Sequence, residues 1–217
     1  MEYSKSQPKR MFLRVPDFDE FSRLVEAYEG KYKDLDSVYT MALQKLKKIS
    51  LQDLGSNDVE SVLRPYFLKW GQMNRVLGIR GCQVICDKLK QLSPKIEKFR
   101  FESLSVVDLD ANSESVKIYD GIMDAKWKSE KGKTKRVGPT SASKALHLVA
   151  PDLFMIWDRK IRNYYDFQEG GEEYLRFLVN MKNWLKKLKP TIDLLGNKYQ
   201  KPSTKIIDEY NWIKSRT

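Results

Sequence analysis

The chain has 217 residues, of which 41% are hydrophobic and 32% charged, so it is long enough to bury one large core or two small ones. Lysine and arginine outnumber aspartate and glutamate by 40 to 29, which gives a formal charge of +11. Such an excess favours a polyanionic partner or an anionic surface, although a merely soluble, lysine-rich protein has the same composition. The charge says nothing about the fold.

The cysteines and the first residues exclude several classes. Cys82 and Cys86 are four positions apart in a helical stretch, which is poor disulfide geometry, and two thiols alone cannot hold a structural zinc ion or an iron–sulfur cluster. We expect both thiols to be buried and reduced, as in a cytosolic protein. The first fifteen residues contain no long apolar run, so neither a signal peptide nor a membrane anchor is predicted.

Helical periodicity dominates the chain, and no convincing run of alternating strand residues occurs. The predicted helices lie within residues 16–30, 34–50, 56–78, 81–100, 112–128, 140–149, 158–165, 170–190 and 203–214. Pro65 is expected to kink or split the third of these, Pro94 to interrupt the fourth, and Asn112 or Ser113 to cap the fifth. The class predicted is all-α, without internal repeats.

A basic loop precedes the sixth predicted helix. Between Lys126 and Arg136 there are six basic residues against one acid, Glu130. A solvated charge run is the usual explanation for such a stretch. The alternative is a grip on one nucleic-acid strand, because the loop leads directly into a helix start.

That helix start, "VGPTSAS", has the features of a phosphate site. Gly138 lets the backbone approach a ligand closely, and Pro139 is tolerated in a first helical turn. Free N–H groups at a helix start attract phosphate, and Ser141 and Ser143 add hydroxyl donors.

The following helix has one apolar face, which predicts the side packed on the core: Ala142, Ala145, Leu146 and Val149. Thr140, Lys144 and His147 fall in a narrow stripe on the opposite side. A solvent-facing side is the simplest interpretation of this stripe, and a side facing a cleft is the alternative. His147, the single histidine, is expected to be a hydrogen-bonded structural residue, and no metal site can be built from it.

Residues 136–162 resemble the hairpin region of the helix-hairpin-helix DNA glycosylases. In that family a glycine turn leads into a helix rich in small residues, and a catalytic aspartate follows the hairpin lysine by eighteen or nineteen positions. Here Thr140 stands at the lysine position, and Asp158 follows it by eighteen positions, in "WDRKIRNYY". Arg136 replaces the first hairpin glycine, and the usual Leu-Pro-Gly lead-in is absent.

The resemblance implies a single all-α domain spanning residues 1–217, built as two lobes that meet at a cleft containing Asp158. The hairpin and catalytic segment would cover about residues 121–165. Upstream, "FLKWGQMNRVLG" is similar to the family helix whose glutamine fills the gap left by a flipped base, and Gln72 would be that residue. No four-cysteine cluster follows, so the chain does not resemble the iron–sulfur branch.

The resemblance also implies a chemistry. Removing a base builds positive charge on the sugar, and a carboxylate beside the sugar stabilises that charge and can activate water. Asp158 would take this role, although an aspartate opening a helix is commonly a capping residue worth about 1 kcal/mol. Thr140 cannot form a Schiff base, which predicts base removal without strand cleavage. If the polar stripe faces the cleft, Lys144 could instead lose its proton and attack the sugar.

The remaining site residues follow from the same comparison. Those expected to contact the DNA backbone are Lys133, Lys135, Arg136, Gly138, Thr140, Ser141 and Ser143. Those expected to flip the base or line its pocket are Trp70, Gln72 and Trp157.

The sequence therefore favours a base-excision repair glycosylase that removes a damaged or mismatched base from double-stranded DNA. We expect a monomer in the cytoplasm, at the nucleoid, or in the nucleus, without a membrane, metal or cofactor, apart from a monovalent cation that the hairpin turn could hold. The alternatives are a helix-hairpin-helix DNA-binding protein without catalysis and an all-α interaction module whose charge is incidental.

Overall fold

The computed structural model describes residues 12–109 and 114–217. The longer helices of the first half, with a two-stranded ribbon after them, are α1 (Phe18–Tyr32), α2 (Asp36–Leu46), α4 (Gly78–Ile96), α5 (Glu114–Met123), β1 (Lys126–Lys128) and β2 (Thr134–Arg136). Those of the second half are α6 (Gly138–Val149), α7 (Arg159–Tyr164), α8 (Gly171–Lys187), α9 (Lys189–Tyr199) and α10 (Ser203–Lys214). Short turns complete the set: η1 (Lys33–Leu35), η2 (Leu51–Asp53), α3 (Ser56–Asp58), and the π-helical η3 (Val59–Leu63) and η4 (Pro65–Trp70).

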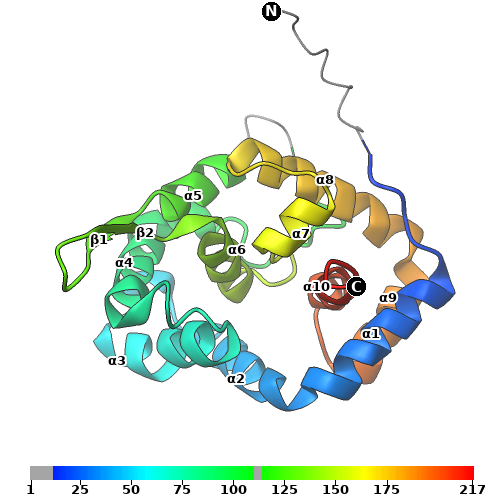
Figure 1. The fold of residues 1–217 in the computed structure, drawn as a ribbon, viewed down its shortest axis with the longest axis horizontal. Helices are drawn as coiled ribbons and strands as arrows, with labels where there is room; N and C mark the ends of the chain where they lie inside the picture. Colours follow the sequence, from blue (N-terminus) through cyan, green and yellow to red (C-terminus); the bar gives the residue numbers. More distant parts are fainter. Residues whose placement is uncertain (1–11, 110–113) are drawn as a thin grey trace, which may run out of the picture.

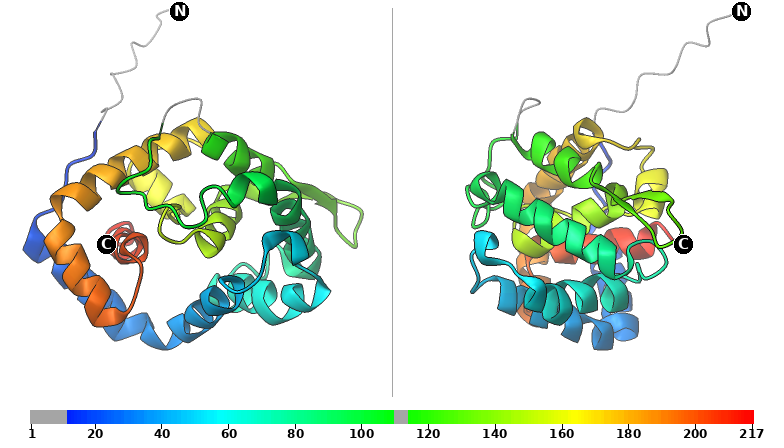
Figure 2. Two further views of the ribbon diagram at one scale, coloured as in Figure 1. Left: turned by 180° about the vertical axis from the view of Figure 1, so that it is seen from behind. Right: turned by 90° about the vertical axis from the view of Figure 1, so that its left-hand side faces the viewer.

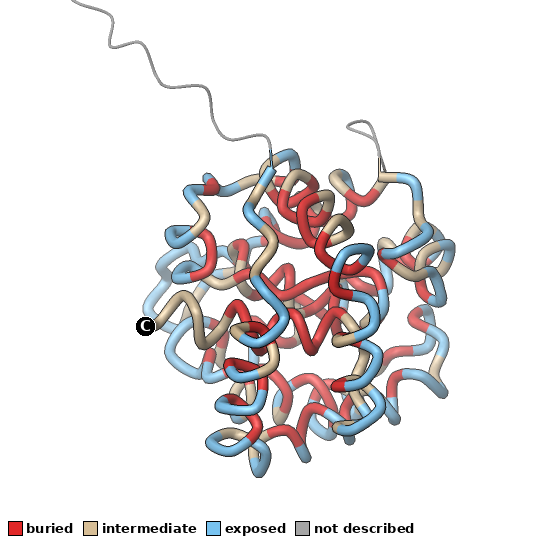
Figure 3. Tube along the Cα trace, turned by 90° about the vertical axis from the view of Figure 1, so that its right-hand side faces the viewer, coloured by how far each residue is buried: buried red, intermediate tan, exposed pale blue. Residues whose placement is uncertain are grey.

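The helices form a ring around two central helices, α6 and α10 (Figure 1). The view from behind in Figure 2 shows the same enclosure, with α1, α2, α4, α5, α8 and α9 on the outside. Nine of the twelve residues of α6 and eight of the twelve of α10 are buried. Figure 3 shows the buried stretches inside the molecule and the exposed ones on its outer turns.

The described part of the chain is mostly helical, as the periodicity predicts. Asp17 caps α1, and α10 matches its predicted span of residues 203–214. The core face predicted for α6 is confirmed, because Ala142, Ala145, Leu146 and Val149 are all buried. Cys82 and Cys86 are buried free thiols, and burial raises their pKa values to about 12 and about 11.

Four local predictions differ from the structure. Pro94 does not interrupt α4, because it lies in the last turn, where only one backbone hydrogen bond is lost. The third predicted helix is divided where Pro65 begins η4, as expected, but it ends at Trp70 instead of continuing to Gly78. The sequence between residues 189 and 199 forms a helix that was not predicted, and the basic loop is an antiparallel ribbon. The capping expected of Asn112 or Ser113 lies outside the described residues.

A tight turn follows η4 and shapes the site. A Cβ atom at Gly71 would lie 2.6 Å from the carbonyl oxygen of Phe67, so only glycine fits there. The next residue, Gln72, has a φ of 53°, which is uncommon for a residue with a side chain. The turn therefore fixes the direction in which the chain leaves Trp70.

Candidate active site

A cavity of about 460 Å³ opens between α1, the turn after η4, and the N-terminal ends of α6 and α7. Five of the residues selected from the sequence line it: Trp70, Gln72, Thr140, Lys144 and Asp158. They come from three segments that are far apart in the chain. The polar stripe of α6 therefore faces a cavity and the core rather than open solvent, which corrects the simplest interpretation of that stripe.

The start of α6 delivers Lys144 to this cavity. Gly138 has a φ of 75°, a left-handed conformation that glycine adopts without strain, and Thr140 and Lys144 follow one turn apart. The Nζ atom of Lys144 donates to the Gly71 carbonyl over 2.9 Å and lies 5.1 Å from the centre of the Trp70 indole ring. Among the described residues, no carboxylate forms an ion pair with this amine.

The surroundings of Lys144 disfavour its charged form. Burial lowers the pKa of Lys144 to about 8, and the positive charges of Lys205 and Arg216 act in the same direction. The carboxylates of Asp208 and Asp158 oppose the shift without cancelling it. With this pKa, roughly a tenth of the amine is neutral and nucleophilic at pH 7 and about half of it at pH 8.

Asp158 caps α7, as the sequence predicts. Its Oδ1 atom accepts a hydrogen bond of 2.9 Å from the N–H group of Ile161, and its Oδ2 atom is paired with Arg216. The side chain is 20% exposed, which leaves it reachable from the cavity. Its catalytic role stays a prediction.

The last helix supplies a wall of the cavity that the sequence analysis missed. Asp208, Trp212 and Arg216 of the α10 segment line it, and they recur every four residues, which places them on one helix face. Asp208 is 3% exposed, and its Oδ1 atom is buried without a hydrogen-bond partner among the described residues. The four-residue spacing was the available signal, but nothing in the sequence connects it with Asp158.

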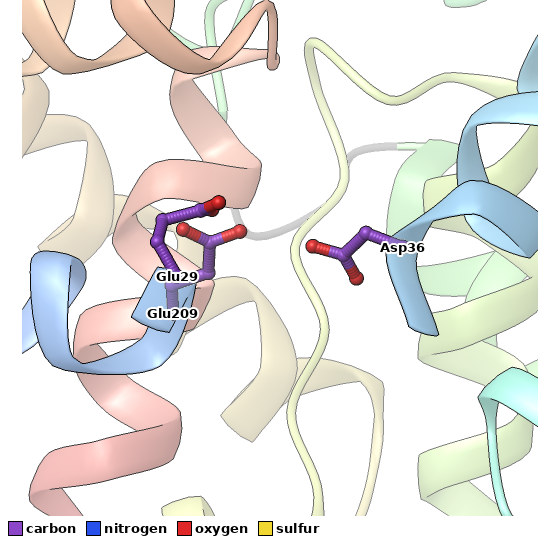
Figure 4. Close-up of side chains that lie close together, drawn as sticks. All are labelled: Glu29, Asp36 and Glu209. Atoms are coloured by element: carbon purple, nitrogen blue, oxygen red, sulfur yellow. The ribbon is translucent and has the colours of Figure 1, made fainter. Parts of the chain in front are cut away.

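Behind this wall lies a buried charge cluster, which comprises Glu29, Asp36, Lys201, Lys205, Asp208 and Glu209. In Figure 4 the carboxylates of Glu29 and Glu209 lie close together, and Asp36 points toward them from the start of α2. The ammonium group of Lys201 pairs with all three of these carboxylates. This ammonium group therefore provides a counter-charge shared by the three carboxylates.

Lys205 is the second cation of the charge cluster. Its Nζ atom lies 3.0 Å from Glu209 Oε1 and 4.3 Å from the centre of the Tyr28 ring. Burial disfavours the charge of Lys205, but Glu209, Tyr28 and Asp208 outweigh burial and raise its pKa well above the usual value. The cluster is joined to the cavity through Trp70, whose Nε1 atom donates to Asp36 Oδ1 over 2.9 Å.

Several residues predicted for the site lie elsewhere. Ser141 and Ser143 are fully buried, so their hydroxyls do not face a phosphate; Ser141 donates to Met73 and Ser143 to the Thr140 carbonyl. Trp157 is also fully buried, with its Nε1 atom bonded to Tyr119 Oη over 2.8 Å, and is not part of the cavity. In each case the side chain packs into the core, because α6 and the segment before α7 are covered on that side.

The polar residues of the ribbon remain at the surface. Lys133, Lys135 and Arg136 are exposed, and Arg136 forms ion pairs with Asp124 and Glu169. Lys135 donates to the carbonyl of Val76, a residue of the cavity rim, over 3.4 Å. The ribbon therefore adjoins the cavity.

His147 is a structural residue, as predicted. It is fully buried between Tyr39 Oη at 2.8 Å and the Phe154 carbonyl at 2.7 Å. Burial lowers its pKa to about 4, so the ring is neutral at pH 7.

Comparisons with known proteins supply no relative for this geometry: no protein-family model matches the chain, and neither a curated protein nor a solved structure matches it. In the described ranges, no helix is long and apolar enough to cross a bilayer. The function is therefore inferred from the site itself.

Proposed function

We propose that the protein is a DNA glycosylase that removes a damaged or mismatched base, with Lys144 as nucleophile and Asp158 as the carboxylate beside the sugar. The observation that carries the proposal is that a half-buried amine with a lowered pKa and a capping carboxylate line the same cavity. Helices α5 and α6 would be the two helices of the hairpin motif, with the β1–β2 ribbon in place of a short turn.

The cavity suits a flat heterocyclic base. The indoles of Trp70 and Trp212 line it, and aromatic faces of this kind stack on bases. The carboxylate of Asp208 lines the cavity, and a rotation of this side chain would turn its buried, unpartnered Oδ1 atom toward an N–H group on the edge of such a base. Gln72, exposed at the rim in a strained conformation, is placed to enter the gap that a flipped base leaves.

Exposed cations lie at the rim of the cavity and next to it in the chain. Arg159 and Lys160 are exposed at the start of α7, and Arg75 and Arg80 are exposed after Gln72. The ribbon adds further lysines on the same side, next to the Val76 rim. Such a rim favours the phosphates of a polyanion, independently of its sequence.

The chemistry then follows from the neutral amine. The nitrogen of Lys144 attacks C1′ of the deoxyribose, and the N-glycosidic bond breaks with its electron pair leaving on the base, which takes up a proton. Asp158 stabilises the positive charge that develops on the sugar. After the nitrogen loses its proton, the ring opens to a Schiff base, from which elimination cleaves the strand on the 3′ side. This route differs from the hydrolysis that Thr140 at the lysine position implies.

A panel of duplexes tests the proposal. Duplexes carrying 8-oxoguanine, uracil, hypoxanthine, alkylated adenine or a simple mismatch are incubated with the protein, with Asp158→Asn, with Lys144→Gln and with Lys187→Gln. Lys187 is exposed at the end of α8 and serves as a control of equal charge change. Half of each sample is heated in alkali, and a parallel set is reduced with borohydride.

Strand cleavage without alkali, together with a borohydride-trapped complex that requires Lys144, is the expected result. Product only after alkali, lost in Asp158→Asn and retained in Lys144→Gln, would assign hydrolysis instead. Salt-sensitive binding without product on any duplex would contradict catalysis and leave the non-catalytic DNA-binding protein.

A further inference from the structure

Arg216, just beyond the end of α10, holds the carboxylate of Asp158 from the cavity side. The pair joins Arg216 Nη2 to Asp158 Oδ2, and both side chains are 20% exposed. Because Oδ1 is bound by the N–H group of Ile161, both oxygens of Asp158 have fixed partners. The carboxylate therefore cannot rotate without losing one of these bonds.

The guanidinium of Arg216 is itself held in place. Its Nη1 atom donates to the Trp212 carbonyl and to Ser215 Oγ, each over 3.0 Å, and its Cζ atom lies 4.1 Å from the centre of the Trp212 ring. Trp212 in turn packs edge-on against Tyr32, with ring centres 4.5 Å apart. Terminal turns commonly fray, whereas this turn is attached to α1. A planar guanidinium with two bonded donors and a stacked face is well suited to fixing a carboxylate.

The charges that face Lys144 come from every element around it. Asp158 precedes α7, Asp208 and Lys205 belong to α10, and Arg216 follows α10. The turn after η4 contributes only the neutral Gly71 carbonyl and the Trp70 ring. Two carboxylates are thus opposed by two cations, and removing Arg216 would leave two carboxylates against one cation.

We propose that Arg216 is a positioning residue of the site, which holds Asp158 beside the sugar and offsets the negative charge that this carboxylate presents to the Lys144 amine. The inference rests on the proposed function, because it assigns Arg216 to the Lys144 chemistry. It identifies a residue 58 positions away from Asp158 in the sequence.

The sign of the effect is fixed by the charges. Without Arg216, Asp158 is uncompensated, so the pKa of Lys144 rises from about 8. Burial is the largest cause of the lowered pKa of Lys144 and Arg216 a smaller one, so the loss of this single charge raises the pKa by up to roughly one unit. Below both pKa values, the neutral fraction of the amine, and with it the rate of Schiff base formation, falls by up to roughly tenfold. At pH 10 the amine is mostly neutral in either protein, so the two rates converge.

The test is single-turnover borohydride trapping on a duplex with a preformed abasic site, from pH 6 to pH 10. An abasic duplex is chosen because it requires no base recognition. Arg216→Gln removes the charge, Arg216→Lys retains it with different geometry, and Lys214→Gln is the matched control on the same helix, where Lys214 pairs with Glu20 outside the cavity.

Arg216→Gln should trap more slowly at pH 6.5, by up to roughly tenfold, equal the wild type at pH 10, and show a midpoint higher by up to roughly one unit. Arg216→Lys should keep the wild-type midpoint with a lower plateau, and Lys214→Gln should match the wild type. If Arg216→Gln traps more slowly by the same factor at every pH, Arg216 is a structural residue. If Arg216→Gln traps faster than the wild type, Arg216 blocks Asp158 instead of positioning it. Either result overturns the proposal.

Two further outcomes keep the proposals separable. Absence of trapping by the wild type at every pH contradicts the proposed function itself, whereas trapping without the pH-dependent difference contradicts only the role of Arg216. If Arg216→Gln does not fold, Arg216→Lys carries the test, because a midpoint moved by more than about half a unit despite the retained charge overturns the proposal.

Discussion

Lys144 and Lys205 lie against the same indole but differ in chemistry. Their Nζ atoms lie 5.1 Å and 5.7 Å from the centre of the Trp70 ring. Lys205 has Glu209 and Asp208 as ion-pair partners and its pKa is raised, whereas Lys144 has a carbonyl and a ring, and its pKa falls to about 8. Burial acts on both amines, so the bonded carboxylates decide between a structural cation and a candidate nucleophile.

Replacing Lys144 tests the reactive half of this comparison and has the largest expected effect. Lys144→Gln should abolish borohydride trapping and slow base removal roughly a thousandfold, because the amine that attacks the sugar is gone. The free energy of unfolding, measured in urea, should stay within about 1 kcal/mol of wild type, since no ion pair is broken. A variant that remains active would assign the chemistry to Asp158 and water.

Replacing Lys205 tests the structural half. Lys205→Met should lower the free energy of unfolding by about 3–5 kcal/mol, because it leaves Glu209 and Asp208 buried without this cation. Urea titration followed by circular dichroism measures the loss, and Lys45→Met, at an exposed position of α2, is the control. A change below about 1 kcal/mol would mean that Lys201 alone compensates the cluster.

His147 extends the comparison to a third desolvated base, one without any carboxylate partner. Its pKa in the folded state, about 4, lies below the usual 6.5, so the unfolded chain binds more protons between these values. Stability is therefore retained above pH 6.5 and falls as the pH decreases toward 4, by about 2–3 kcal/mol at pH 4.5. Unfolding curves at pH 7 and 4.5 should differ by less in His147→Gln than in wild type, and equal differences would contradict this assignment.

Asp208 lines the cavity and also belongs to the buried charge cluster. Replacing it therefore separates recognition of the base from the effect of its charge on Lys144. Asp208→Asn should slow excision of a damaged base roughly 10- to 100-fold, because a hydrogen bond from the base to a charged acceptor is lost. The same variant removes a negative charge facing Lys144, so the pKa of Lys144 falls further. Borohydride trapping on a preformed abasic site at pH 7 should therefore become faster. Equal slowing on both substrates would place Asp208 in the chemistry rather than in base recognition.

The smallest effect is expected at the ribbon, which adjoins the cavity rim at Val76 but contributes no residue to the cavity lining. Lys126, Lys131 and Lys133 are exposed and form no ion pair among the described residues. Changing all three to serine should reduce the slope of log affinity against log salt by up to about 3, at roughly 0.9 for each phosphate contact. The control changes Lys45, Lys47 and Lys48, at the end of α2 opposite to the cavity; an equal reduction there would remove any special role of the ribbon.

The sequence predicts local features of the site better than the assembly around it. Spacing within α6 identified the core face and the Thr140–Lys144 stripe, and the capping pattern identified Asp158 at the start of α7. No local pattern reveals that Ser141 and Ser143 are covered on their own side. Burial of a helix on all faces depends on the ring of helices around it, and that ring is formed by long-range packing.

The same limit explains the missed half of the cavity. The pattern of α10 predicts an amphipathic helix, and its lysines would be placed in water by default. Lys205 is instead fully buried, because Asp208 and Glu209 pair with it and Asp36, from the start of α2, adds compensating charge. The neighbouring Lys201 pairs with Glu29 and Asp36, from the first helices of the chain. Because the residues of this ion-pair cluster come from both ends of the chain, neither segment by itself contains a pattern that predicts the cluster.

The central position of α10 also affects how the chain folds. Contacts such as Lys214 with Glu20 join residues 194 positions apart, and α1 packs along α10. Closing so large a loop comes before these contacts can stabilise the chain, so folding should be slower than in helical bundles built from neighbouring helices. During synthesis, α1 and α2 emerge long before α10, and until it arrives Glu29 and Asp36 lack the lysines that neutralise them. The same late helix that completes the core also completes the site, so a nascent chain gains stability and the full cavity wall in one step.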